Sequence, residues 1–151
     1  MNKKYRKAII AGNWKMNLLP SEVKPFVELV RSSLPNSKSC ETVLCVPLTH
    51  ISSLRRSLKD SRLSVGTQDV SEHGFGAYTG EVAAEMLTDL GVKYVIVGHS
   101  ERREYHGESD FTVGQKAANV IENGMIPIIC VGESLEQRER GVTMQHVACQ
   151  L

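Results

Sequence analysis

The sequence has 151 residues, with 18 Lys and Arg against 17 Asp and Glu, which gives a formal net charge of +1. This length suffices for one domain with a sizeable core. The charges are mixed along the chain, and no basic run follows the pattern of a nucleic-acid backbone binder, so we expect no nucleic-acid partner.

The sequence also lacks the usual targeting and membrane signals. The basic residues 1–7 precede an apolar stretch at 8–11 that Gly12 and Asn13 interrupt, which is too short for a signal peptide. No segment approaches the length of a membrane span. We therefore expect a cytoplasmic protein without a membrane partner.

The four cysteines do not follow a metal-binding or redox pattern. Cys40, Cys45, Cys130 and Cys149 form no CxxC pair and have no histidine at metal-ligand spacing. Cys45 and Cys130 lie in apolar runs, where a free thiol behaves as a small buried side chain. We expect structural cysteines and no metal site.

Five apolar runs are typical of β-strands and alternate with helical patterns. Strands are expected at 8–11, 43–46, 63–66, 92–97 and 126–131. Helices are expected at 21–33 and 49–59, from after residue 81 to a cap at Gly91, from 109–110 to Gly124, at 134–140, and from 143 onward. Apolar residues in these helices recur at three- and four-residue spacing, as one buried stripe requires. Such alternation indicates βαβ units and a parallel sheet.

The predicted fold class is therefore α/β. Units of about thirty residues match the repeat of a (β/α)8 barrel, whose usual length is about 250 residues. A parallel sheet needs cover on both faces and must close or protect its edges. We expect residues 1–151 to form a single domain that is a truncated barrel, with about five βα units present and strands six to eight absent.

The fourth expected strand ends in a group of polar residues. Its apolar run shows no polar alternation, so it is buried on both faces, and the residues after Gly98 emerge at its carboxyl end. Ligands of parallel α/β folds collect at that end. His99 could be an ordinary histidine at a strand end. Its place after a glycine, before residues that open a helical turn, favours a neutral imidazole that donates a hydrogen bond to a carbonyl oxygen.

Two other expected strands end in polar residues. The first is followed by Asn13 and Lys15, and the Lys15 ammonium suits an anionic substrate or a developing enediolate. A solvated loop lysine would show the same pattern. The fifth is followed by Glu133, which could act as a general base, although we favour a carboxylate that caps the first turn of the next helix.

A long glycine-rich loop at 73–81 follows the third expected strand. Gly74, Gly76 and Gly80 give the spacing G-x-G-x-x-x-G, which differs from the dinucleotide-binding fingerprint in spacing and in position. We therefore expect no nicotinamide cofactor. A long loop with two aromatic residues is more typical of one that grips a neighbouring molecule or covers a site.

Four motifs together resemble the triosephosphate isomerase family. They lie at 11–17 (AGNWKMN), 76–81 (GAYTGE), 97–103 (VGHSERR) and 130–133 (CVGE). The resemblance extends from the first strand into the helix after the fifth. It implies a cofactor-free (β/α)8 barrel enzyme of glycolysis and gluconeogenesis that interconverts dihydroxyacetone phosphate and glyceraldehyde 3-phosphate through an enediolate.

The resemblance also implies roles for individual residues. The catalytic group would be His99, Lys15 and Glu101, with His99 as a neutral electrophile at the substrate carbonyl, a property attributed to this family. Lys15 would counter the phosphate and enediolate charges, and Glu101 would hold its ammonium. Asn13, Lys15 and Ser100 would bind or support the substrate.

The same resemblance implies a homodimer formed through the loop around residues 69–81. Thr79 would reach the neighbouring subunit and brace its Asn13, while Gln68 and Glu81 would stiffen the loop. Asp69 stands where many relatives carry Asn, which is a departure from the family pattern.

The family's catalytic base is a glutamate at the end of the sixth strand, and most of its phosphate grip also follows that strand. Proton abstraction needs a positioned base, so we expect negligible isomerase activity from this polypeptide alone. One alternative is a non-catalytic half-barrel that keeps the dimer loop and acts as an interaction module. Another is a different phosphate-binding barrel enzyme that uses Glu133 as its base.

Overall fold

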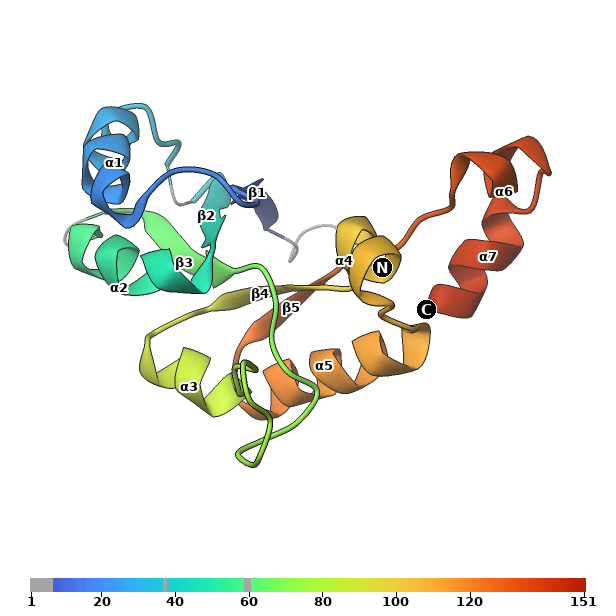
Figure 1. The fold of residues 1–151 in the computed structure, drawn as a ribbon. Helices are drawn as coiled ribbons and strands as arrows, with labels where there is room; N and C mark the ends of the chain where they lie inside the picture. The colour runs from blue at the N-terminus through green and yellow to red at the C-terminus, as the bar shows by residue number, and fades with distance from the viewer. Residues whose placement is uncertain (1–6, 37, 59–60) are drawn as a thin grey trace.

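A computed structural model describes residues 7–36, 38–58 and 61–151. Its strands form one parallel sheet in the order β1-β2-β3-β4-β5. Their bounds are β1 Ala8–Asn13, β2 Cys40–Val46, β3 Leu63–Thr67, β4 Tyr94–Val97 and β5 Ile126–Ile129. The sheet curls into part of a barrel (Figure 1), which confirms the α/β class and the first five strands of a (β/α)8 barrel.

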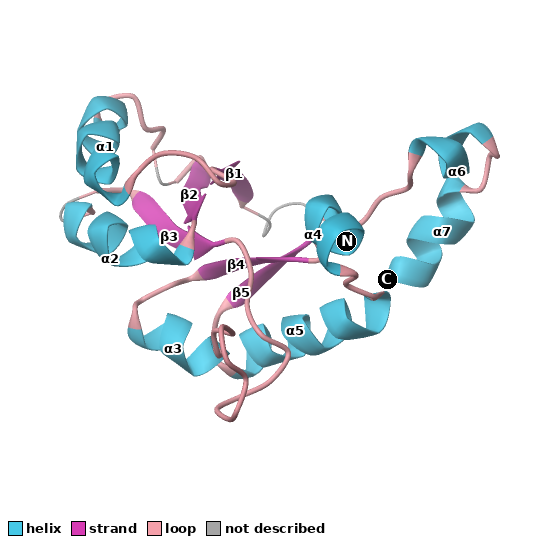
Figure 2. Ribbon diagram, in the orientation of Figure 1, coloured by secondary structure: helices cyan, strands magenta, loops and turns pink. Residues whose placement is uncertain are grey.

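Helices connect the strands in the predicted alternation. Their bounds are η2 Pro20–Glu22, α1 Val23–Arg31, α2 Leu48–Ser57, α3 Ala84–Asp89, α4 Ser100–His106, α5 Asp110–Glu122, α6 Leu135–Glu139 and α7 Thr143–Gln150. Helices α1, α2, α3 and α5 cover the outer face of the sheet, whereas α6 and α7 form a separate hairpin (Figure 2). Residues 1–6 and Lys59, the expected end of the second helix, lie outside the described residues.

Alternating residues of the strands face two different cores. Leu44 and Val46 pack outward against the helices, while Val43 and Cys45 face the concave side of the curled sheet. Burial raises the pKa of the Cys45 thiol to about 12, so this cysteine is an unreactive part of the core, as expected. Cys130 is half-buried and packs against the same inner core.

Among the described residues, β1 and β5 each have one neighbour in the sheet. Both strands expose large apolar side chains, including Ile10 at 60% and Ile129 at 46%. Unpaired strand edges with apolar residues are templates for pairing with other chains.

In the described part of the chain, no helix has the length and apolar character needed to cross a bilayer.

The 151-residue chain is therefore expected to self-associate in isolation, because pairing at β1 and β5 would satisfy backbone groups and cover apolar surface. Sedimentation velocity over a range of micromolar concentrations measures this. A monomer at every concentration that unfolds in one cooperative transition would contradict the expectation.

Candidate active site

A cleft of about 680 Å³ opens at the carboxyl ends of the strands. Its lining includes Asn13 and Lys15 from the end of β1 and His99 and Glu101 after β4, so residues predicted at two separate strand ends come together. Gln68 and Glu81 also line the cleft, whereas Ser100 and Thr79 are exposed residues outside its lining. The parallel topology explains the grouping, because all five strands end at the same edge of the sheet.

Lys15 and Glu101 form an ion pair across this cleft. The Lys15 Nζ atom lies 2.6 Å from Glu101 Oε1, and the two residues belong to the β1 loop and to α4. The hydrogen bond from Lys15 lowers the pKa of the Glu101 carboxyl below its ordinary value. Glu101 is thus ionised at neutral pH and fixes the Lys15 ammonium group in the cleft.

The backbone of Lys15 adopts an unusual conformation. Its φ of 53° is left-handed, which costs a residue with a Cβ about 1–2 kcal/mol. The Lys15 N–H donates to Asn13 Oδ1 at 3.0 Å, and Gln68 Nε2 donates to the Lys15 carbonyl oxygen at 3.0 Å. Gln68 Nε2 also donates to the carbonyl oxygen of Cys45 at 2.9 Å. Gln68 therefore supports the Lys15 turn, and its expected role in stiffening the long loop stays a prediction.

His99 connects β4 to α4. Gly98 precedes it with a φ of 67°, and a Cβ there would lie 2.7 Å from Val113 Cγ1, so only glycine fits. His99 is the N-cap of α4, and its Nδ1 accepts a hydrogen bond from the Glu101 N–H at 3.2 Å. A ring whose Nδ1 accepts carries its proton on Nε2, so the structure favours a neutral imidazole with Nε2 as its donor.

The Glu101 carboxylate also lies near the His99 ring. Its Oε2 is 3.5 Å from Nδ1, a contact that would suit a protonated imidazole. The Glu101 N–H contact is shorter and requires a free lone pair on the same nitrogen, so we assign Nδ1 as an acceptor.

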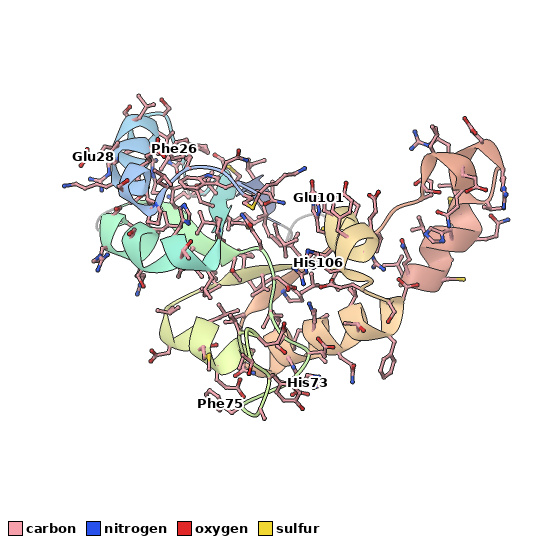
Figure 3. All side chains as sticks on the ribbon, in the orientation of Figure 1. Phe26, Glu28, His73, Phe75, Glu101 and His106 are labelled. Carbon is pink, nitrogen blue, oxygen red and sulfur yellow. The ribbon has the colours of Figure 1, made fainter. Side chains whose placement is uncertain are left out.

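The loop around residues 69–81 is held in shape by contacts within the loop and by contacts of Asp69 and Ser71 with Lys116 and Asn119 of α5. The rings of His73 and Tyr78 stack with centroids 4.1 Å apart and planes 10° apart. A Cβ at Gly76 would lie 2.8 Å from Tyr78 Cε2, and the Glu81 N–H donates to the Tyr78 carbonyl oxygen. His73 and Phe75 lie at the far end of this loop (Figure 3), where Phe75 is 70% exposed.

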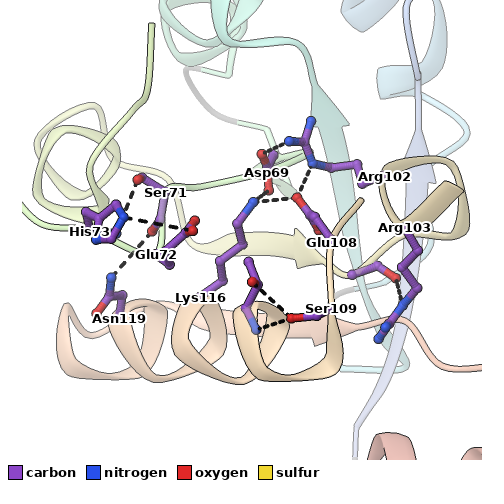
Figure 4. Close-up of polar contacts among 12 residues, drawn as sticks. Asp69, Ser71, Glu72, His73, Arg102, Arg103, Glu108, Ser109, Lys116 and Asn119 are labelled. Atoms are coloured by element: carbon purple, nitrogen blue, oxygen red, sulfur yellow. Dashed lines mark hydrogen bonds and ion pairs between the residues drawn. The ribbon is translucent and has the colours of Figure 1, made fainter. Parts of the chain in front are cut away.

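A cluster of four charged residues includes Asp69 and Arg102, which line the cleft, together with Glu108 and Lys116 (Figure 4). Lys116 Nζ is 2.7 Å from Asp69 Oδ1 and 2.5 Å from Glu108 Oε1. Arg102 Nη2 is 2.9 Å from Asp69 Oδ2, and Arg102 Nε is 2.5 Å from Glu108 Oε1. Burial raises the pKa of the Asp69 carboxyl. Burial also acts to raise the pKa of Glu108, but the hydrogen bonds that Glu108 accepts from Lys116 and Arg102 outweigh this effect and lower its pKa. The cluster was not predicted from the sequence.

Glu133 has a structural partner away from the cleft. Its Oε1 accepts a hydrogen bond from Arg138 Nε at 2.8 Å and lies 3.5 Å from Thr143 Oγ1. The side chain that caps α6 is Ser134, so the expectation that Glu133 caps this helix is wrong. Glu133 also lies outside the lining of the cleft, which disfavours its use as a general base there.

Replacing Lys15 by Met is expected to return the pKa of Glu101 towards its ordinary value, because the ammonium hydrogen bond is the main cause of the lowering. A carboxyl whose pKa is lowered by folding stabilises the fold above its unfolded pKa and loses that contribution as the pH falls through the folded value. Titration of the Glu101 carboxyl carbon by NMR measures the change. An unchanged pKa in Lys15→Met would contradict the pairing.

These features define a parallel (β/α)-barrel protein with a cleft that holds charged side chains at the carboxyl ends of its strands. A family model described as triosephosphate isomerase matches residues 8–151, and the chain belongs to the triosephosphate isomerase family.

Curated triosephosphate isomerases from three bacteria show the extent of the similarity. The identity is 46% for Gloeothece citriformis, 46% for Thermus thermophilus and 49% for Thiobacillus denitrificans, each over 97% of this chain. The chain spans 61%, 58% and 58% of the length of these relatives.

Proposed function

We propose that this chain carries the electrophilic part of a triosephosphate isomerase site, for the interconversion of dihydroxyacetone phosphate and glyceraldehyde 3-phosphate. The observation that supports this most is the joint placement of the Lys15–Glu101 ion pair and of His99, with Nε2 as its donor, in one cleft. The family to which the chain belongs supports the same reaction.

The chemistry follows from these groups. When a proton is removed next to the substrate carbonyl, negative charge develops on the carbonyl oxygen. The His99 Nε2–H donates a hydrogen bond to that oxygen and helps to move protons between the two substrate oxygens. The Lys15 ammonium, fixed by Glu101, is a preorganised charge that stabilises the enediolate and the phosphate. Asn13 holds the Lys15 backbone N–H and contributes to substrate binding.

The proton itself must go to a base. Of the carboxylates that line the cleft, Glu101 is engaged with Lys15, Asp69 is engaged with Arg102 and Lys116, and Glu81 belongs to the long loop. Glu133 lies outside the lining. In the family pattern the base is a glutamate at the end of the sixth strand. We therefore assign to residues 1–151 the groups that polarise the substrate, and not the group that abstracts the proton.

The long loop around residues 69–81 is the proposed dimer contact. The stacked rings of His73 and Tyr78 contribute to its shape, while Phe75 and Thr79 are exposed. Thr79 of one copy would support Asn13 of the other.

The cytoplasmic location remains a prediction.

The function is tested by comparing two polypeptides. The 151-residue chain alone is expected to show negligible triosephosphate turnover, because a missing general base alone lowers the rate by about 10²–10⁴-fold. A fusion of this chain to the remaining carboxyl-terminal part of the Thermus thermophilus relative is expected to be active. Robust turnover by the chain alone would contradict the assignment of the base. A folded but inactive fusion would favour the non-catalytic interaction module.

A further inference from the structure

Helix α4 carries Glu101 and has His99 as its N-cap, yet apolar packing does not hold it in place. None of its seven residues is buried, whereas α1, α2, α3 and α5 each have buried residues. A helix this short is not stable on its own, so tertiary contacts must fix it. Its polar contacts are therefore the place to look for what sets the geometry of the site.

Arg103 holds one side of α4. Its Nε donates to the Gly98 carbonyl oxygen at 2.8 Å, and its Nη2 donates to the Cys130 carbonyl oxygen at 3.3 Å. Its Nη1 donates to Asp110 Oδ1 at 2.5 Å. The three acceptors belong to the residue after β4, the segment after β5 and the first turn of α5. The side chain is 18% exposed. One planar guanidinium thus joins α4 to three other segments.

Arg102 holds the other side. It contacts Asp69, which follows β3, at 2.9 Å, and Glu108, which precedes α5, at 2.5 Å. Lys116 of α5 contacts the same two carboxylates and completes the cluster (Figure 4). Adjacent arginines on α4 therefore engage opposite neighbours, the β3 side and the β5 side.

The backbone transmits this attachment to His99. The N–H groups of Arg102 and Arg103 both donate to the His99 carbonyl oxygen, at 2.8 and 3.1 Å. Arg103 also binds the carbonyl of Gly98, the residue before His99. Any shift of α4 would move the Glu101 N–H that fixes His99 Nδ1, together with the carboxylate that fixes Lys15.

We propose that Arg102 and Arg103 are positioning residues that hold α4 between the ends of β3 and β5 and thereby orient His99 and Glu101. The inference depends on the proposed function only in naming His99 as the electrophile. Arginine suits the role because its planar group offers several donors in fixed directions, which the single ammonium of lysine lacks. A lysine at either position keeps the charge but loses the geometry.

The first measurement is hydrogen exchange of the 151-residue chain by mass spectrometry at low micromolar concentration. Arg103→Lys and the double variant with Arg102→Lys are expected to speed exchange of the α4 amides by about 10- to 100-fold, since hydrogen bonds to charged groups are lost. Exchange in β2, β3 and β4 should stay unchanged. Arg140→Lys is the matched control, because Arg140 pairs only with exposed Glu136 on α6 among the contacts described.

The second measurement is the acylation rate of each histidine by diethyl pyrocarbonate, which attacks the free lone pair of a neutral imidazole. His99 Nδ1 is protected by the Glu101 N–H, so the two variants are expected to acylate His99 about tenfold faster, the rate ratio for loss of one such bond. His50, which is 4% exposed, should remain slow and reports the integrity of the core.

Unchanged α4 exchange or unchanged His99 acylation in the double variant would overturn the proposal. A second outcome would also overturn it: in both Arg103→Lys and the double variant, all strands lose protection uniformly and His50 is acylated fast. The arginines would then serve the general stability of the fold. Neither readout involves a triose phosphate, so an inactive fusion would count against the proposed function and leave this inference intact.

Discussion

In the fusion with the Thermus thermophilus carboxyl-terminal part, Lys15→Met is expected to lower kcat/KM for triosephosphate interconversion by about 10²–10³-fold or more. The variant removes the ammonium that Glu101 fixes 2.6 Å away, and with it the charge that stabilises the enediolate and the phosphate. Steady-state kinetics in both directions measures the loss.

Lys24→Met provides a matched control for that prediction. Lys24 also pairs with a carboxylate, Glu28, but both side chains are exposed on α1, at 75% and 62%, and lie outside the cleft lining. Its activity should equal that of the unmodified fusion. A Lys15→Met fusion that keeps more than about a tenth of the activity would contradict the proposed role.

Glu108→Gln is expected to destabilise the protein by about 3–5 kcal/mol at neutral pH. The side chains of Lys116 and Glu108 are only 3% and 5% exposed, so losing the carboxylate leaves a buried ammonium with Asp69 as its remaining anionic partner. Urea unfolding at pH 7 measures the change in the free energy of unfolding.

The pH dependence of this effect has a defined sign. Hydrogen bonds lower the pKa of Glu108 in the folded state, so its contribution is complete above the unfolded pKa and is lost as the pH falls through the folded value. The difference between Glu108→Gln and the parent should therefore shrink in acid. Glu136→Gln, on an exposed pair, is the control, and a Glu108→Gln effect below about 1 kcal/mol would indicate that the cluster contributes little.

The order and type of most elements could be predicted from the sequence, because apolar periodicity survives in any fold that buries one face. The ends were less predictable. The expected strand at 92–97 begins at Tyr94, since the Val92 N–H is used by the Leu87 carbonyl oxygen in the turn after α3. β2 begins at Cys40, three residues earlier than expected, where Glu41 makes a hydrogen bond and ion pair with Lys93.

Helix α4 was foreseen only as a helical turn. It has no apolar stripe, and its position depends on Arg102 and Arg103 meeting acceptors that are distant in the sequence or belong to the backbone. Such partners follow from the tertiary fold and leave no periodic signal.

The contacts of the candidate site also differ in whether the sequence could predict them. Asn13, Lys15, His99 and Glu101 could be placed together because each follows a parallel strand, and strand ends share one edge of the sheet. The hydrogen bond from Gln68 to Lys15 joins residues 53 positions apart and had no local signature.

The burial of Lys116 could have been recognised from the sequence. It shares a helical face with Val113, Ala117 and Val120, which are buried. A lysine on such a stripe requires a buried anionic partner, and this signal could have predicted part of the charge cluster.

The proposed role of His99 can be tested through the infrared carbonyl stretch of dihydroxyacetone phosphate bound to the fusion. Hydrogen-bond donation from a neutral His99 and the nearby Lys15 ammonium polarises the carbonyl, so we expect a lower frequency than for the free substrate. In His99→Gln the frequency should move back towards the free value. Identical frequencies in the parent fusion and in His99→Gln would contradict the proposal that His99 is the electrophile.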